Sequence, residues 1–352
     1  RDVKAVEPNT NDTLLSLERL KVELRLWKLL KKEVEIEEIS IRNATFDTRD
    51  FIDGVVVNGH LGELYLESHG VVFSPETARI NEFSVKNTDV SLTLENMEDT
   101  DTTTTEPIYW KILLDEIDFE NVGFALNMPQ DSLFVRTMLP KTTLKDGIVD
   151  LKEASYYVKS FDMDNAELAY GPKEELSLKK IGLQLDSIYY CGRDIRANVE
   201  EFVFKERSGL ELVSTEGRIA SDSVLIQIPK FTMKTTASSL DLQTKIGWDV
   251  LEMKKTGVLS AKINAEIGKG DVAKILGGRD TLFLQTYPNK PFVFRADAEG
   301  DLNRLRLRTL EAGLAKAFEL KAEGNLLNLT DSTCRGGEIN LVAETYDMRF
   351  LR

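Results

Sequence analysis

Histidine, the side chain used most often in acid–base catalysis and zinc binding, is nearly missing from this chain. The 352 residues include two histidines, His60 and His69. A three-histidine zinc site would need a third imidazole, which the sequence lacks. Both histidines fall in a stretch where apolar and polar residues alternate, and an exposed histidine without a ligand is the ordinary arrangement there. We therefore expect no metal centre and no catalytic histidine.

One glycine-rich stretch, GKGDVA (268–273), has the spacing G-x-G-x-x-A of dinucleotide-binding turns. That chemistry requires a strand–turn–helix unit in a parallel sheet and an acidic residue about 20 positions further on to hold the ribose. The flanking residues alternate as in an antiparallel sheet, and no acidic residue follows at that distance. The stretch predicts a turn into a short helix, and we expect no cofactor.

Carboxylates are abundant, with 59 Asp and Glu residues, so pairs at glycosidase-like spacing carry no information. EDTD (98–101) and DMDN (162–165) resemble parts of a calcium loop, but both lack the further ligands and the glycine of an EF-hand. The sequence also contains no HExxH, GxSxG or GxxxxGKS/T motif. We expect no catalytic residues and no enzyme activity.

The formal net charge of −14 limits the partners of the chain. A nucleic-acid backbone requires clustered Lys and Arg, so no nucleic-acid partner is expected, and docking on an anionic membrane surface is disfavoured.

The two cysteines, Cys191 and Cys334, predict either one disulfide or two buried free thiols. No apolar run reaches the roughly 18 residues of a transmembrane helix. We expect an excised piece of a longer protein, with any membrane anchor outside it.

Alternation with period two dominates the chain, as in VELRL (22–26) and LRLR (305–308). This pattern is typical of strands with one apolar and one polar face. Helical stretches are few and short: WKLLKK (27–32), and GDVAKILGG (270–278) with an aspartate to cap its start. The acidic, threonine-rich stretch 96–107 predicts a mobile loop within one architecture. We expect an all-β, antiparallel fold over residues 1–352 as a single elongated domain.

One phrase occurs four times: EISIRNATF (38–46), EFSVKNTDV (82–90), EIDFENVGF (116–124) and SFDMDNAEL (160–168). The central asparagines are Asn43, Asn87, Asn121 and Asn165, with spacings of 44 (87 − 43), 34 (121 − 87) and 44 (165 − 121) residues. Such spacings indicate a repeated unit, which we expect to hold about four strands of roughly eight residues. Because asparagine tolerates left-handed backbone, each one should mark a mid-strand kink or bulge that shifts side-chain parity by one.

Apolar residues before each asparagine form a stripe, continued by weaker echoes of the phrase at 201–212 and 230–242. The stripe consists of Ile39, Ile41, Phe83, Val85, Ile117, Phe119, Phe161, Met163, Phe202, Phe204, Phe231 and Met233. Such a face must be covered, either by a second sheet or barrel closure, which makes a dry core, or by a nonprotein ligand. Because stacked repeats favour an elongated body, we predict a curved sheet that forms a taco-like β-groove, lined by these residues for lipid acyl chains.

The opening phrase LLSLERLKVELRLWKLLKKEVEIEEISIRNATF (14–46) resembles the start of the AsmA-like and TamB-like envelope proteins. In that family a strand, a short double-leucine turn and an isoleucine-rich strand follow an inner-membrane anchor. Leu29 and Leu30 fall at the turn, and Asn43 falls at the kink of the second strand. LRLRTLEAGLAKAFELKAEGNLLNLTD (305–331) and GEINLVAETYD (337–347) resemble the family's strand–Gly–strand phrasing.

The resemblance implies an elongated β-groove of the bridge-like lipid transfer class, held in the periplasm of Gram-negative bacteria by an inner-membrane anchor. Its ligand would be phospholipid or another acyl-chain lipid, conducted between the inner and outer membranes. An alternative role in the family is assembly of outer-membrane β-barrel or secreted proteins through strand edges, with a β-barrel protein as partner. A β-sandwich structural or adhesin-like domain with a dry core is the second alternative. The family brings no catalytic residues and no cofactor.

Overall fold

The computed structural model describes residues 3–7, 13–25, 36–48, 54–73, 76–95, 109–252, 256–277 and 281–349. Strands account for 74% of the structure, and the described residues include three short helices. The expected all-β class, with only short helices and a sheet not closed into a barrel, is therefore confirmed. The chain divides into two compact units, Arg1–Cys191 (unit 1) and Gly192–Arg352 (unit 2), which are described separately. The single domain over residues 1–352 stays a prediction.

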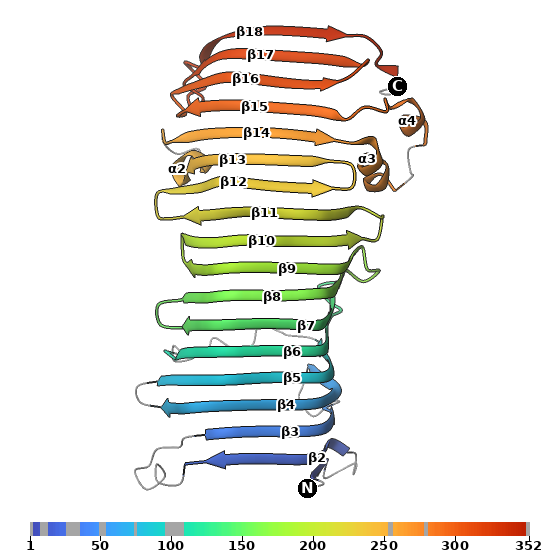
Figure 1. Ribbon diagram of the computed structural model, residues 1–352, viewed down its shortest axis with the longest axis vertical. Coiled ribbons are helices and arrows are strands. Elements are labelled where there is room, and N and C mark those ends of the chain that lie inside the picture. The colour runs from blue at the N-terminus through green and yellow to red at the C-terminus, as the bar shows by residue number, and fades with distance from the viewer. Residues whose placement is uncertain are drawn as a thin grey trace. The chain divides into compact units, whose positions relative to one another are not determined.

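Unit 1 is a sheet of nine described strands, each paired with the next along the chain (Figure 1). They are β1 (Val3–Val6), β2 (Thr13–Leu24), β3 (Ile36–Asp47), β4 (Val55–Phe73), β5 (Glu76–Leu94), β6 (Lys111–Met128), β7 (Leu133–Asp150), β8 (Ser155–Tyr170) and β9 (Leu176–Cys191). From β4 onward each strand has 16 to 19 residues. These strands are about three times the usual length. Each one is therefore long enough to cross the bottom of a curved sheet and the inclined parts on either side of it.

One pairing in unit 1 departs from antiparallel order. Strands β5 and β6 run parallel, from Thr77 opposite Lys111 to Thr93 opposite Asn127. A parallel pair requires the chain to return to the end where the first strand began before the second strand starts. The loop predicted at 96–107 falls between β5 and β6 in the sequence and lies outside the described residues. The parallel register places successive copies of the repeated phrase side by side.

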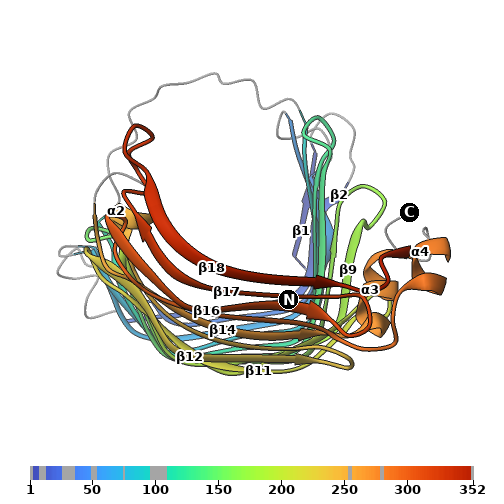
Figure 2. The ribbon, with the colours of Figure 1, turned by 90° about the horizontal axis from the view of Figure 1, so that it is seen from above.

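Unit 2 is an antiparallel sheet of nine described strands, again paired in chain order. They are β10 (Asp194–Glu206), β11 (Glu211–Ser221), β12 (Leu225–Thr235), β13 (Ser239–Gly247), β14 (Leu259–Ile267), β15 (Phe292–Gly300), β16 (Arg304–Leu314), β17 (Phe318–Leu327) and β18 (Gly336–Thr345). The helices are α2 (Trp248–Leu251), α3 (Lys269–Ile275) and α4 (Thr281–Thr286). Figure 2, which looks along the strand stack, shows that strands such as β18 are bowed, so the sheet of unit 2 is curved.

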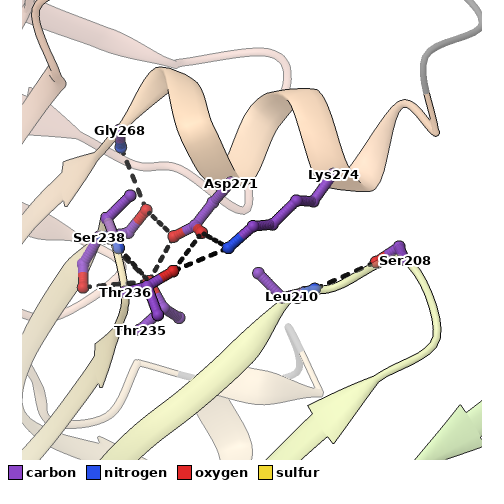
Figure 3. Close-up of polar contacts among 9 residues, drawn as sticks. Ser208, Leu210, Thr235, Thr236, Ser238, Gly268, Asp271 and Lys274 are labelled. Atoms are coloured by element: carbon purple, nitrogen blue, oxygen red, sulfur yellow. Dashed lines mark hydrogen bonds and ion pairs between the residues drawn. The ribbon is translucent and has the colours of Figure 1, made fainter.

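Helix α3 confirms the short helix expected at 270–278, but its N-cap is Gly268 rather than the aspartate. Asp271 is 2% exposed, and its carboxylate accepts hydrogen bonds from Ser238 Oγ at 2.6 Å and from Thr235 Oγ1 (Figure 3). Lys274 Nζ lies 3.6 Å from the same carboxylate. Burial raises the pKa of Asp271, but the hydrogen bonds and the lysine outweigh it and hold the pKa below its ordinary value. This network ties α3 to the turn between β12 and β13.

Helix α4 is held by a small core at the ends of β15, β16 and β17. The core consists of Tyr287, Leu314 and Ala317, packed against Phe283, Phe292, Phe318 and Met348. Burial raises the pKa of the Tyr287 hydroxyl, as expected for an apolar site. Both helices therefore lie beside strand ends (Figure 2) and leave the middle of the sheet uncovered by them. The other predicted helix, 27–32, lies outside the described residues.

Candidate apolar binding face

Two rows of apolar side chains cross the sheet of unit 1. Residues directly opposite each other on neighbouring strands point to the same face, as do residues two apart along a strand. Row 1 consists of Ile39, Leu66, Phe83, Ile117, Leu144, Phe161 and Leu185, and row 2 consists of Ile41, Leu64, Val85, Phe119, Thr142, Met163 and Leu183. The eight stripe residues predicted in unit 1 thus share one face, in continuous register over seven strands.

Both rows contain no charged side chain, and their members pack on one another. The rings of Phe83 in row 1 and Phe119 in row 2 meet edge to face, with centroids 6.2 Å apart. Val85 and Thr142 are buried by these neighbours, whereas most other members of the rows are half-buried. The face is therefore a packed apolar surface, with side chains that support one another laterally.

The opposite face of unit 1 carries charge. Five glutamates face one another across β2 to β6: Glu23, Glu38, Glu67, Glu82 and Glu116. Like charges directly opposite each other are unfavourable, and a lysine at each end of the series offsets part of the repulsion. Lys21 Nζ lies 2.9 Å from both Glu23 and Glu38, and Lys145 Nζ lies 2.8 Å from Glu116. The hydrogen bond to Glu116 raises the pKa of Lys145. This is the face that suits water.

The four repeated asparagines form a line of bends across the sheet. Asn43, Asn87, Asn121 and Asn165 have φ angles of 49°, 50°, 53° and 54°, which confirms the predicted left-handed kinks. Directly after two of them, Ala44 and Ala166 are 3% and 1% exposed. Small, buried side chains at these positions indicate that the apolar face lies on the inner side of the bend.

The asparagines also correct the size of the repeat. Two of them lie on β3 and β5 and two on β6 and β8, so a spacing of 44 residues covers two long strands rather than four short ones. A left-handed residue lets a strand bend without ending. In the sequence, by contrast, an asparagine predicts a turn at which the strand ends. The neighbouring strands accommodate the line: a Cβ on Gly62 would lie 2.6 Å from the carbonyl oxygen of Asn87. Pro140, which has no N–H, lies opposite the kink at Asn121.

A second line of irregular residues crosses unit 1, and sequence reasoning missed it. It passes through Asn81 and Asp115, each six residues before the asparagine of its own strand, and through Asp146 and Ser187, whose φ angles are 52° and 55°. Asn81 Nδ2 donates to Asp115 Oδ2 at 2.9 Å, and Lys159 Nζ donates to Asp146 Oδ2 at 2.9 Å. The available signal was a polar residue at one fixed distance from each repeated asparagine.

Beyond this second line the apolar face continues. A Cβ on Gly147 would lie 3.2 Å from Leu144 Cδ2 and 3.3 Å from Leu114 Cβ. Gly147 and Leu114, which are opposite each other, therefore share the face of Leu144 and hence of row 1. Because side chains alternate along a strand, Val149 and Ile112 point to this face too. The apolar face thus extends from the first line of bends toward the strand ends.

Unit 2 contains an equivalent pair of rows. One consists of Met233, Leu240, Ala265, Phe294, Ala312, Leu320 and Ala343, and the other consists of Phe231, Leu242, Ile263, Ala296, Leu310, Ala322 and Leu341. Both again lack charged residues over seven strands. The predicted residues Phe231 and Met233 are their first members, but the alanines and leucines that continue them had no motif by which to find them.

The last predicted pair, Phe202 and Phe204, lies in β10 with ring centroids 5.4 Å apart. Phe204 is opposite Leu212, which is 4% exposed and opposite Thr235. Because Thr235 is two residues from Met233 on β12, Phe204 points to the apolar face of unit 2. Phe202 is placed by its ring contact with Phe204.

The described residues supply little cover for these faces. In each unit all described strands belong to one sheet, so no second described sheet of that unit lies over the rows. On β2, Leu20 and Val22 are opposite Ile41 and Ile39 and extend the two rows, yet they remain 45% and 48% exposed. Burial of apolar surface contributes roughly 25 cal/mol per Å², so a ligand that covers these rows gains a large driving force.

The two histidines and the two cysteines are the side chains on which the sequence predictions about other chemistry rested. His60 and His69 are exposed, and His69 Nδ1 lies 2.6 Å from Asn81 Oδ1. No cluster suited to a metal ion occurs among the described residues. Cys191 and Cys334 are both free thiols, so the alternative of free thiols is confirmed and the disulfide is wrong; the expected burial is also wrong, because Cys191 is half-buried and Cys334 is exposed. Within the described part of the chain, no helix is long and apolar enough to cross a membrane.

No family model matches the chain, and no curated protein matches it. The candidate site therefore rests on its own geometry, which is an uncharged, inward-bent apolar face in unit 1 and an uncharged apolar face on the curved sheet of unit 2.

Proposed function

We propose that the apolar faces of both units bind the acyl chains of lipids and let them slide along the rows. The observation that carries this proposal is the continuity of row 1 and row 2 over seven strands without one charged side chain. A closed pocket would bind one ligand at one place, whereas a continuous row offers the same surface at each successive strand. Lipid can move along such a surface without crossing a charged or strongly hydrated position.

The mechanism is passive and uses no catalytic group. Acyl chains cover the rows, where burial of apolar surface drives binding, and polar headgroups stay in water at the open side. Because neighbouring strands present similar side chains, one step along the sheet exchanges one apolar contact for another. The barrier to sliding is therefore set by the packing of side chains rather than by hydrogen bonds.

The resemblance of residues 14–46 to AsmA-like and TamB-like envelope proteins supports a more specific proposal. The protein is then a periplasmic, inner-membrane-anchored conduit that carries phospholipid between the inner and outer membranes of a Gram-negative bacterium. The left-handed asparagines at φ of about 50° agree with the kinked strand that carried the resemblance. Anchor and membrane contacts would come from residues outside those described.

Lipid extraction from protein purified without detergent, followed by mass spectrometry, tests the proposal. We expect co-purified diacyl lipids at one or more molecules per chain. Detergent washing should remove them, and incubation with phospholipid vesicles should restore them. A protein that stays lipid-free after both gentle purification and incubation with vesicles would contradict acyl-chain binding.

A second candidate function is assembly of β-barrel or secreted proteins through strand edges. The observation that favours it is β18, whose ten residues are all exposed, including Leu341 at 61% and Val342 at 59%. Exposed apolar strands can pair with a strand of another chain. Cysteine crosslinking from β18 to a β-barrel partner in cells would support this role, and crosslinks only to lipid-binding components would argue against it.

A further inference from the structure

Two tyrosines stand as a pair at one end of β8 and β9. Tyr156 is the second residue of β8, and Tyr190 is the residue before the last of β9. They are directly opposite each other, with ring centroids 6.0 Å apart. Their exposures are 40% and 45%, and among the described residues neither phenol hydroxyl has a hydrogen-bond partner. The pair thus presents two hydroxyl groups, each at the end of an exposed apolar ring.

The pair points to the apolar face. Tyr156 is opposite Val149 on β7, and Val149 shares the face of Gly147. The Cβ position of Gly147 contacts the side chain of Leu144, a member of row 1. From Tyr156 to Phe161 of row 1 the chain runs five residues, about 16 Å of strand. The tyrosines therefore stand where the apolar face reaches the end of the strands.

We propose that Tyr156 and Tyr190 bind the interfacial group of a glycerolipid, while its acyl chains lie on rows 1 and 2; this inference rests on the proposed acyl-chain binding. A phenol ring with a hydroxyl tip suits a boundary between hydrocarbon and water, as tyrosines do at membrane interfaces. Each hydroxyl can donate one hydrogen bond. The matching chemistry is an acceptor oxygen next to the acyl chains, which a glycerolipid supplies as an ester carbonyl or a phosphate oxygen.

The chain offers a matched control beside each tyrosine. Tyr157 and Tyr189 follow and precede the pair directly, are opposite each other, and point to the other face because side chains alternate. Tyr157→Phe therefore removes the same hydroxyl at nearly the same place on the wrong side of the sheet. Any effect on strand packing or solubility should be similar for both faces.

The experiment uses the whole protein loaded with three photoactivatable phosphatidylcholines, and maps the crosslinked residues by mass spectrometry. The first probe carries its diazirine on the headgroup, the second on acyl carbons next to the ester, and the third at the acyl terminus. We expect the second probe, the first, or both to label peptides with Tyr156 or Tyr190, and the third to label rows 1 and 2. The first probe alone indicates phosphate recognition, and the second alone indicates ester recognition.

Phenylalanine variants complete the test. Tyr156→Phe and Tyr190→Phe should each reduce the interfacial crosslinks about fivefold, the value of one hydrogen bond, with the acyl-terminal crosslinks unchanged. Tyr157→Phe should change neither. The inference is overturned if interfacial crosslinks are spread over all strand ends, or if Tyr157→Phe reduces them as much as Tyr156→Phe. Loss of crosslinks from all three probes in the wild-type protein instead rejects acyl-chain binding itself.

Discussion

Asn121 Nδ2 donates a hydrogen bond to Asn87 Oδ1 at 3.3 Å, across the parallel joint between β5 and β6. The two residues occupy the same left-handed backbone conformation, with φ of 53° and 50°. A parallel joint keeps two copies of the repeated phrase in register, so their kinks coincide and the bend continues across the joint. In an antiparallel pair the two strands run in opposite directions. The second kink would then lie beside the first only if it stood at a different position in its own strand.

Replacement of Asn121 tests whether left-handed backbone holds the bend. Asn121→Ile places a β-branched side chain in a conformation that costs L-residues about 1–2 kcal/mol, and it also removes the hydrogen bond to Asn87. Asn121→Gly removes the same hydrogen bond but has no Cβ to strain. We expect the isoleucine variant to lower the free energy of unfolding in urea by at least 1 kcal/mol more than the glycine variant. Equal stability of the two variants would show that backbone strain plays no part.

The glutamate series on the outer face gives a prediction with the opposite sign. Glu82 is directly opposite Glu67 and Glu116. Glu82→Lys replaces two like-charge pairs with two opposite-charge pairs, so it should stabilise the protein by about 0.2–1 kcal/mol per pair. The gain should shrink as salt is added, because exposed charges are screened.

Thermal unfolding at low and high ionic strength measures this gain. Glu82→Gln is the control, since at the same exposed position it removes the two like-charge pairs without adding an attractive charge. A Glu82→Gln variant no more stable than the wild type would show that repulsion within the glutamate series is not the cause.

The kinks were predictable because asparagine recurs at the same position of a repeated apolar phrase, which indicates that this position has the same structural role in each copy. Asn43 and its three counterparts carry a conformational preference that is local, so the sequence alone indicated both the kink and the shared face. The length of the strands was not predictable in the same way. Asparagine usually ends a strand, whereas these strands continue because their neighbours accommodate the kink, as Gly62 does beside Asn87 and Pro140 does opposite Asn121.

The second line of irregular residues and the parallel pairing of β5 with β6 depend on partners far away in sequence. Asp115 is held by Asn81 and Arg79, 34 and 36 residues earlier, and nothing in the sequence around Asp115 specifies those partners. Likewise, Ala265 and Ala296 belong to the apolar rows of unit 2 through cross-strand register alone. Local patterns give the faces of strands, whereas strand pairing decides which residues complete a row.

Asp271 makes the attachment of α3 sensitive to acid. Its pKa is lowered in the folded state, so the ionised form contributes stability above the unfolded-state pKa, near 4. That contribution is lost as the pH falls through the lower, folded-state pKa. Asp271→Asn should cost about 1–3 kcal/mol at pH 7, since the amide has one acceptor oxygen where the carboxylate has two, so a part-buried hydroxyl of the network loses its acceptor. The difference between wild type and variant should shrink below pH 4.

Hydrogen exchange of residues 269–275 at pH 7 measures the local effect, and urea unfolding at pH 7 and pH 3 measures its pH dependence. Asp249→Asn is the control, because Asp249 is an exposed carboxylate in the first turn of α2. Faster exchange in α3 should occur with Asp271→Asn only. An equal loss of stability at both pH values would show that the ionised carboxylate is not what holds the helix.

Phe119→Glu tests whether row 2 faces a ligand or a protein core. On a face covered by lipid, the glutamate can remain hydrated once the lipid leaves, so the protein should fold with a loss below about 2 kcal/mol and bind little lipid. In a closed protein core the same charge would be buried without a partner and should unfold the chain.

Gln184→Glu is the control, because it adds the same charge at an exposed position between Leu183 and Leu185 and points to the outer face. Circular dichroism reports the fold, and mass spectrometry of extracted lipid reports binding. The lipid proposal requires a folded, lipid-poor Phe119→Glu beside a folded, lipid-loaded Gln184→Glu, whereas unfolding of Phe119→Glu alone would mean that protein covers row 2.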